Sequence, residues 1–361
     1  MSTQTSTRFW HAHSDVIFPN KREVVGVPNV YEQAESLGGT FTRIVHGVPH
    51  ENIFNFSPSL LRHNNNTYIA WRGQKEPFGF RYDSKYFYLN DTPTDIYIGV
   101  LADDQTVLGA KKLRSQKHRL SYEDPRLFVG PDDNMYVQFV ASTYASRFDQ
   151  KKHSLFANPK VVVCYVDEHL NAVSAAIPPL GRNRDSSQTE KNWCFFSRKD
   201  KLHCLYSTRP LVVEREEEEP IQVNTDCLAE ITRNAPTFNS TAPVNVGYGH
   251  LVFYHWKHMQ FREDGIQYLQ YHLGAYIVDR DFTKVIYKTM DPIFSGSLND
   301  QVIQWTAHDG TPMSTQPAVI LPFSAHLEND ELVMPLGVND AFMGVFRCPL
   351  ASIMRLMTRV D

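Results

Sequence analysis

Short apolar strands separated by turns dominate the pattern of hydrophobic and polar positions along the chain. The apolar runs are five to eight residues long and rich in β-branched and aromatic residues, which favours strands over helices. Turn-rich stretches such as HNNNT, GPDDN, SRKDK and LENDE lie between them. Helical patterns are scarce: residues 31–37 predict a helix of one or two turns, and residues 350–357 are ambiguous. The pattern therefore predicts an all-β protein.

A degenerate repeat groups these strands into pairs. Five apolar strands each follow a turn or another strand, and they are residues 66–73, 134–142, 201–209, 249–256 and 331–338. Several copies continue with a strand, an acidic turn and a return strand, as in GAYIVDRDFTKVI. Two hairpins repeated five times give five four-stranded antiparallel sheets, and a ring of such sheets leaves only short, protected edges. We therefore predict a single five-bladed β-propeller over residues 51–361, with residues 1–50 packing on it or closing it. A two-sheet sandwich is the alternative.

Polar residues stand at equivalent places in the repeats. The first strand of each blade lines the central channel of a propeller, so polar groups on these strands are candidates for ligand contacts. They are Asn55, Ser57, Glu123, Asp124, Arg126, Glu190, Lys191, Asn192, Asn245 and Gln316, joined by Arg72, Arg209, Tyr254, His255 and Asp340 nearby in the repeats. Each also has a structural interpretation, such as an ion pair between Glu123 and Arg126 or a turn cap at Asp340. Their recurrence in every repeat favours a shared ligand site.

Composition narrows the range of functions. The chain has 36 Lys and Arg against 40 Asp and Glu, a formal net charge of −4. This balance argues against non-specific nucleic-acid binding, because that needs a basic surface. No apolar run approaches the roughly 18 residues of a membrane span. The five cysteines show no CxxC spacing, so no metal site is expected. The first residues lack the apolar stretch of a signal peptide, and reduced thiols in the cytoplasm are the expectation.

Several motifs occur in the order found in a known family. They are Ser-Pro-Ser within residues 56–59, Tyr-Glu-Asp-Pro-Arg at 122–126, Lys-Asn at 191–192, Arg-Pro at 209–210, the stretch 251–255 and Leu-Gly-Ala at 273–275. Together they resemble glycoside hydrolase family 130, which comprises β-mannoside phosphorylases and their hydrolytic relatives. The likeness runs from about residue 52 to residue 347, and Glu-Asp-Pro-Arg is its most specific part.

The resemblance implies a five-bladed propeller with its active site in the axial depression, and inverting chemistry in which Asp124 is the catalytic acid. That role is chemically sensible because a glycosidic oxygen leaves poorly unless it is protonated. An inverting hydrolase also needs a second carboxylate to activate water, and the candidates are Glu190, Asp279 and Asp340. A phosphorylase instead needs cations around phosphate. The positions that match such residues are Arg72, Lys191, Arg209 and His255.

The resemblance also implies contacts to the sugar. The residues expected to orient hydroxyl groups or to stack on a ring are Asn55, Ser57, Glu123, Arg126, Asn192, Trp193, Tyr254 and Asp340. Departures from the family pattern keep the substrate open: Thr208 replaces the usual His before Arg-Pro, Trp256 replaces a Gly, and residues 195–198 replace a Phe-Pro-Glu-Lys stretch.

We therefore expect an inverting β-mannoside (or related β-glycoside) phosphorylase that uses inorganic phosphate and no cofactor. The alternatives are a glycosyltransferase that uses a sugar nucleotide on the same propeller, as in the related glycosyltransferase family 108, and an inverting glycoside hydrolase. A non-catalytic glycan-binding propeller is a further alternative. The expected partners are an oligosaccharide or sugar phosphate substrate and, because the family often self-associates, a second copy of the chain.

Overall fold

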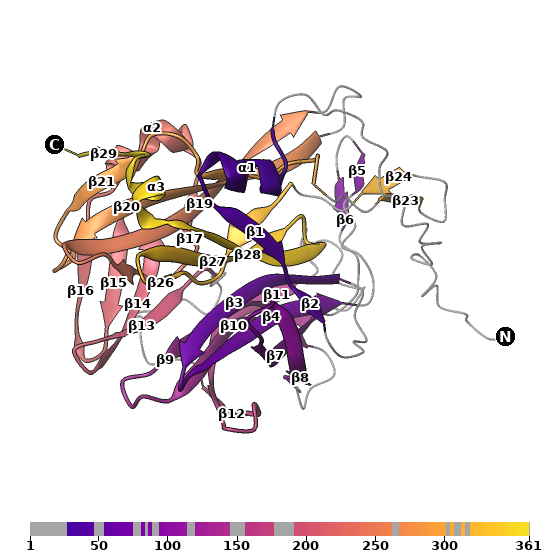
Figure 1. Ribbon diagram of the computed structural model, residues 1–361, viewed down its shortest axis with the longest axis horizontal. Coiled ribbons are helices and arrows are strands. Elements are labelled where there is room, and N and C mark those ends of the chain that lie inside the picture. Colours follow the sequence, from indigo (N-terminus) through magenta and orange to yellow (C-terminus); the bar gives the residue numbers. More distant parts are fainter. Residues whose placement is uncertain are drawn as a thin grey trace.

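The structure is a computed structural model in which nearly every regular element is a β-strand (Figure 1). It describes residues 27–46, 54–74, 81–83, 86–88, 94–113, 120–144, 156–176, 191–261, 267–300, 304–306, 312–314 and 318–360. Most of the described strands belong to five sheets of four or more strands, and two further hairpins stand apart from them. These hairpins are β5 (Arg81–Asp83) with β6 (Tyr86–Tyr88) and β23 (Gln304–Thr306) with β24 (Pro312–Ser314).

The first three sheets follow one another along the chain. The first has the order β2 (Val45–His46), β8 (Thr106–Lys112), β7 (Asp95–Leu101), β4 (Asn66–Gln74), β3 (Phe54–His63). The second has the order β12 (Ala172–Ala176), β11 (Phe156–Val166), β10 (Met135–Tyr144), β9 (Leu120–Val129). The third has the order β13 (Cys194–Arg198), β14 (Lys201–Thr208), β15 (Leu211–Arg215), β16 (Glu218–Val223). Each is built from successive antiparallel hairpins, apart from the short parallel strand β2.

The last two sheets each include a strand from an end of the described chain, β29 in the fourth and β1 in the fifth. The fourth has the order β17 (Thr237–Asn239), β19 (Gly249–Phe261), β20 (Gln267–Asp279), β21 (Val285–Thr289), β29 (Met357–Arg359), with β18 (Val244–Asn245) on β19 and β22 (Phe294–Ser295) on β20. The fifth has the order β1 (Thr40–Arg43), β28 (Phe342–Pro349), β27 (Glu331–Val338), β25 (Ile320–Pro322), with β26 (His326–Glu328) also on β27. Strand β1 therefore completes a sheet whose other strands lie near the C-terminus. The boundary between residues 1–50 and the rest stays a prediction.

The hairpins predicted from the repeat are present. Strands β3 and β4, β9 and β10, β13 and β14, β18 and β19, and β25 and β27 pair antiparallel. The strand–acidic turn–strand pattern forms β7–β8, β11–β12 and β20–β21. The all-β class is confirmed, and the sheets have a propeller-like arrangement (Figure 1).

Apolar clusters join each sheet to the next. In chain order these clusters unite Ala70 with Val137, Phe128 with Phe195, Leu205 with Val252, and Phe253 with Met334. A further cluster unites Val345 of the fifth sheet with Trp71 of the first. The core is therefore divided among the interfaces between sheets, because each sheet buries apolar side chains on both faces.

Helices are few and short in the described residues. The predicted helix at residues 31–37 is confirmed as α1 (Val30–Ser36), which begins with a capping box between Asn29 and Glu32. The ambiguous C-terminal segment begins with α3 (Leu350–Met354), and α2 (Ala229–Thr232) follows a 3₁₀ turn after the third sheet. In the described part of the chain, no helix is long and apolar enough to cross a membrane.

Candidate active site

The Glu-Asp-Pro-Arg motif forms a kink in the inner strand of the second sheet. The pairing of β9 with β10 shifts register between Arg126 and Glu123, so Asp124 and Pro125 stand outside the ladder. Asp124 has φ 54°, a left-handed conformation that aspartate tolerates better than most residues, and Pro125 has no N–H to leave unpaired. Bulges of this kind re-aim a side chain. Here Glu123 is buried while Asp124 is only half-buried.

Strand β3 of the first sheet has a bulge of the same kind. Its pairing with β4 shifts register between Phe56 and Ser59, and Ser57, which also precedes a proline, has φ 52°. Gly337 of β27 lies against this bulge, since a Cβ there would come within 2.8 Å of the Ser57 nitrogen. The Ser-Pro and Asp-Pro motifs therefore shape two neighbouring inner strands in the same way.

Glu123 holds two cations. Its carboxylate lies 2.6 Å from Lys191 Nζ and 3.4 Å from Arg72 Nη2. Burial raises the pKa of Glu123, but the charges of Arg72 and Lys191 outweigh it and hold the pKa well below the ordinary value. Arg72 is itself fixed by donating to Thr94 Oγ1 at 3.0 Å and by lying over the Phe56 ring. The ionised carboxylate of Glu123 on β9 therefore links Arg72 of the first sheet to Lys191, which precedes the first strand of the third sheet. We call this carboxylate the anchor.

Two further carboxyl groups act electrostatically on this anchor. Burial lowers the pKa of Lys191, but the negative charges of Glu123 and Asp124 raise it overall. Asp340 follows β27 in a left-handed turn with φ 49°. Burial raises the pKa of Asp340 to about 7; Arg72 opposes the shift, and the Asp124 and Glu123 charges reinforce it. We call Arg72, Glu123, Asp124, Lys191 and Asp340 the carboxylate–cation cluster.

A second lysine adjoins this cluster. Burial and the charge of Lys191 lower the pKa of Lys257 on β19, so the two ammonium groups repel each other. Neither the motifs nor the repeat singled out Lys257. It stands two residues after His255, and residues two apart on a strand share a face; that spacing is the signal that could have found it.

His255 is neutral near physiological pH. Burial lowers its pKa to about 3, and the charges of Arg126 and Lys257 add to the effect. Its Nδ1 lies 2.9 Å from Ser240 Oγ, and its ring stacks between Phe238 and Tyr271. His255 is thus suited to hydrogen bonding rather than to holding an anion by charge.

Arg126 follows the kink, two residues after Asp124 on β9, and lines a cavity. It donates from Nε to the Trp193 carbonyl at 3.1 Å and from Nη2 to the Asn239 carbonyl at 3.4 Å. The cavity has a volume of about 540 Å³, and the strands β3, β9, β13 and β26 line it together with Ala242 and Phe323. Strands of four sheets therefore line one cavity.

Other predicted site residues lie apart from the carboxylate–cation cluster or make structural contacts. Asn55 accepts a hydrogen bond from Trp71 Nε1 at 2.9 Å, and the Trp193 ring packs on Phe195 and Tyr206. Asn192 has φ 62° and separates Lys191 from this packed ring. Tyr254 is fully buried beside Trp256 and Tyr276, on the face of β19 opposite His255.

The remaining candidates are distributed as follows. Arg209 donates to Thr232 Oγ1 at 3.3 Å and to the Asn234 carbonyl at 3.5 Å, at the end of α2. Asp279 accepts from the Thr283 backbone in a hairpin turn, and Asn245 lies in β18. Glu190 and Gln316 fall outside the described residues. Across the described ranges, no group of three or more metal-ligating side chains is placed to hold an ion.

Comparison with known proteins gives matches of structure. No protein-family model and no curated protein sequence matches the chain. A β-1,2-mannobiose phosphorylase from Listeria innocua matches with TM-score 0.56 and 16% identity, over 88% of this chain and 96% of that one. A protein from the study of glycoside hydrolase family 130 enzymes that target β-1,2 mannosidic linkages in Candida mannan matches with TM-score 0.55 and 13% identity, over 86% and 93%. A GDP-Man-dependent mannosyltransferase from Leishmania mexicana matches with TM-score 0.50 and 10% identity, over 86% and 88%.

These likenesses concern the fold. At such low identities, the chain shares an architecture with mannoside phosphorylases, hydrolases and a mannosyltransferase. The resemblance to glycoside hydrolase family 130 that the motifs predict is confirmed at that level.

Proposed function

We propose that the chain is an inverting carbohydrate-active enzyme that cleaves or makes a β-mannoside, or a related β-glycoside, with inorganic phosphate. We infer that its five sheets are the blades of one propeller, because apolar clusters join them in chain order and the fifth to the first. The reaction would take place on the axis, where the inner strands carry the carboxylate–cation cluster.

The observation that carries the proposal is the position of Asp124. The bulge lifts this carboxyl group out of the β9 ladder, while Glu123 beside it secures Lys191 and Arg72. In this proposal the proton donor stands beside a set of cations. Asp124 would protonate the glycosidic oxygen as the bond to the anomeric carbon breaks, and a phosphate oxygen would attack that carbon from the opposite face. The products would be an inverted sugar 1-phosphate and the free acceptor alcohol.

The phosphate would be held chiefly by Lys191 and Lys257. Burial and the charge of Lys191 lower the pKa of Lys257, and an anion between the two ammonium groups would relieve their repulsion. Lys191 and Arg72 both pair with Glu123, and Arg72 would contribute by direct hydrogen bonds to the phosphate. Neutral His255 would act as a hydrogen-bonding group. Contacts from Arg209 and from Asn55, Ser57, Asn192 and Trp193 remain part of the proposal.

Asp340 would carry a proton near neutral pH. Its pKa of about 7 means that it can donate a hydrogen bond to a sugar oxygen, as a protonated carboxyl group does. In an inverting hydrolase the base that activates water would be Asp340 or one of the other candidates, Glu190 and Asp279. A pKa near the operating pH also suits a general base, so the pKa of Asp340 is compatible with both roles, and the requirement for phosphate distinguishes them.

The second candidate is a glycosyltransferase with a sugar-nucleotide donor. A site with adjacent cations accepts a diphosphate as readily as a phosphate, since both present anionic oxygens. Pure glycan binding is the third candidate. It would not require an aspartate held at positive φ, Asp124, beside Lys191 and Lys257.

The test incubates the protein with mannose 1-phosphate, or separately with a mannosyl nucleotide, and a panel of sugar acceptors. Release of phosphate would support the phosphorylase, and release of nucleotide would support the transferase. We expect Asp124→Asn to abolish either turnover without changing the unfolding midpoint. Asp279→Asn, which alters only a hairpin turn, is the matched control. Turnover that survives in Asp124→Asn would overturn the assignment of the acid, and silence with every donor would overturn the phosphorylase and transferase schemes.

A further inference from the structure

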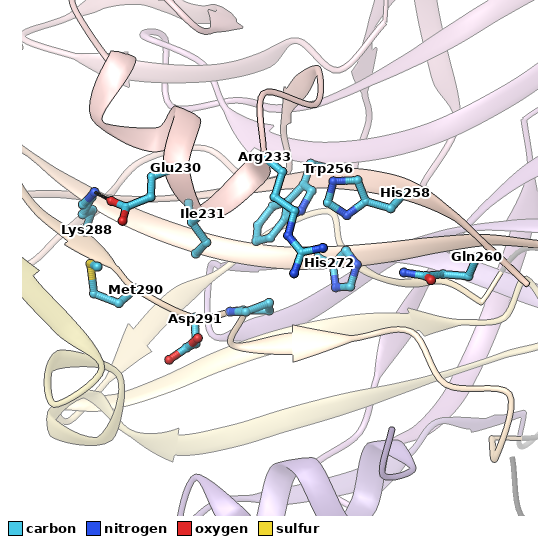
Figure 2. Close-up of a pocket in the computed structure, with 11 residues that line it drawn as sticks. Glu230, Ile231, Arg233, Trp256, His258, Gln260, His272, Lys288, Met290 and Asp291 are labelled. Carbon is cyan, nitrogen blue, oxygen red and sulfur yellow. Dashed lines mark ion pairs between the residues drawn. The ribbon is translucent and has the colours of Figure 1, made fainter. Parts of the chain in front are cut away.

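A second cavity lies between α2 and the fourth sheet (Figure 2). It has a volume of about 300 Å³, and its walls come from α2 and the residue after it, from β19 and β20, and from residues 288–292. A cavity of this size matches the lower end of small-molecule sites and holds about one sugar ring with a substituent.

This cavity is separate from the carboxylate–cation cluster. Alternate residues of a strand face opposite sides of the sheet. Trp256, His258 and Gln260 of β19 line the cavity, whereas His255 and Lys257 lie on the other face, toward Arg126 and Lys191. The β19–β20 ribbon therefore stands between the two sites.

One cation in the cavity has no ionic partner. Figure 2 shows the Arg233 side chain reaching between Trp256 and His272. Glu230 also lines the cavity, but its carboxylate lies 3.5 Å from Lys288 Nζ. Among the described residues, Arg233 makes no ion pair. Its guanidinium group is thus available to an anion, and a planar guanidinium binds carboxylate or phosphate through two parallel hydrogen bonds.

A buried polar group in the cavity wall also lacks a partner. Trp256 is 1% exposed, and within the described part of the chain its indole N–H meets no acceptor. A buried donor without an acceptor costs about 1–3 kcal/mol. The Trp256 ring is stacked on His272 and Tyr254, so the indole is held in place.

His258 and His272 supply hydrogen-bonding nitrogens. His258 Nε2 lies 3.1 Å from the Thr232 carbonyl, which fixes that nitrogen as a donor and makes Nδ1 an acceptor in the neutral ring. His272 Nδ1 lies 2.8 Å from Ser295 Oγ. Burial lowers the pKa of His272 to about 4, and the neighbouring His258 and Arg233 add to the effect. Asp291 adds a carboxylate to the same wall.

We propose that this cavity is a second binding site, for a small hydroxylated anion of the sugar phosphate or sugar acid class. Arg233 would bind the phosphoryl or carboxylate group, and the Trp256 ring would form part of the wall against the sugar. Asp291 and His258 Nδ1 would accept hydrogen bonds from hydroxyl groups. The pairing of one cation with several hydroxyl acceptors disfavours both a neutral sugar and inorganic phosphate. This site is independent of the reaction proposed for the axis.

Calorimetric titration with mannose 6-phosphate and with mannuronate tests the proposal, with mannose and inorganic phosphate as comparison ligands. We expect at least one of the two acids to bind. Arg233→Gln should weaken binding about tenfold or more, and Arg233→Lys should weaken it less, because it keeps the charge but loses the bidentate contact. A preference for the phosphate or for the carboxylate identifies the anionic group.

Two variants separate this site from the axis. Lys257→Gln alters the axial face of the same ribbon and should leave this binding unchanged, as should Lys199→Gln in an exposed turn of the third sheet. Circular dichroism confirms that each variant is folded. The proposal fails if neither acid binds at millimolar concentration, if Arg233→Gln binds like the parent, or if Lys257→Gln alone removes the binding. None of these outcomes depends on whether the axial reaction takes place.

Discussion

Replacement of Glu123 by glutamine tests whether a buried carboxylate holds the candidate active site together. The side chain of Glu123 is 7% exposed and touches Lys191 Nζ at 2.6 Å and Arg72 at 3.4 Å. With an effective dielectric constant of about 20, the two Coulomb attractions come to about 6 and about 5 kcal/mol before desolvation. Much of this gain offsets the cost of removing three charges from water. Removal of one partner from such a buried group costs about 3–5 kcal/mol, and we expect that loss for Glu123→Gln.

Urea unfolding followed by circular dichroism measures the change. The control is Glu218→Gln, which removes a carboxylate 2.7 Å from Lys201 in a pair whose side chains are 39% and 44% exposed. We expect the control to lose less than about 1 kcal/mol, because exposed ion pairs contribute little. A loss in Glu123→Gln no larger than that of the control would refute the argument.

The pH dependence gives a second check on the same variant. The pKa of Glu123 is lower in the folded chain than its ordinary value of 4.5, so the folded state binds fewer protons than the unfolded state in that range. The contribution of Glu123 is therefore complete above about pH 4.5 and declines as the pH falls further. The difference in stability between the parent and Glu123→Gln should be constant from neutral pH down to that point and should shrink below it.

Two further predictions concern Asp340 and Lys257. Because burial raises the pKa of Asp340 to about 7 from 3.8, its ionisation destabilises the fold as the pH rises through that interval. Asp340→Asn should therefore be more stable than the parent in mildly alkaline urea titrations, by up to about 4 kcal/mol, and equal to it in acid; no gain in alkali would contradict this. Lys257→Gln should raise the KM for phosphate, or for the nucleotide sugar, about tenfold with a smaller change in kcat, and an unchanged KM would remove Lys257 from the anion site.

The strand pairs and the class of fold follow from the sequence because turn chemistry and apolar runs are local signals. The hairpin β9–β10 and the return strand β21 can be predicted from the sequence alone. Residues far apart in the sequence carry no such signal. Nothing in the sequence indicates that β1 pairs with β28, or that β25 and β26 share one neighbour, because these contacts depend on how the sheets meet.

The candidate site was predictable in part. Its densest motif, Glu-Asp-Pro-Arg, does mark the kink at Asp124, and Lys191 and Arg72 do meet there. Alternation along a strand would have separated Tyr254 from His255, since neighbours in sequence face opposite sides of a sheet. The same rule would have added Lys257 to the face that His255 occupies. The ionic role of Glu123 could not be read from the sequence, because it depends on two cations from other sheets.

The pairing of β1 with β28 has a consequence for synthesis of the protein. Phe41 finds its partner Phe346 only after the ribosome has made nearly the whole chain. At about 5–20 residues per second, the roughly 300 intervening residues take on the order of 15–60 s to appear. During that interval the edge formed by residues 40–43 is exposed on the nascent chain, where chaperones would have to shield it. The fifth sheet can be completed only after β28 has been translated, so the end of translation, rather than early folding, sets when the protein becomes complete.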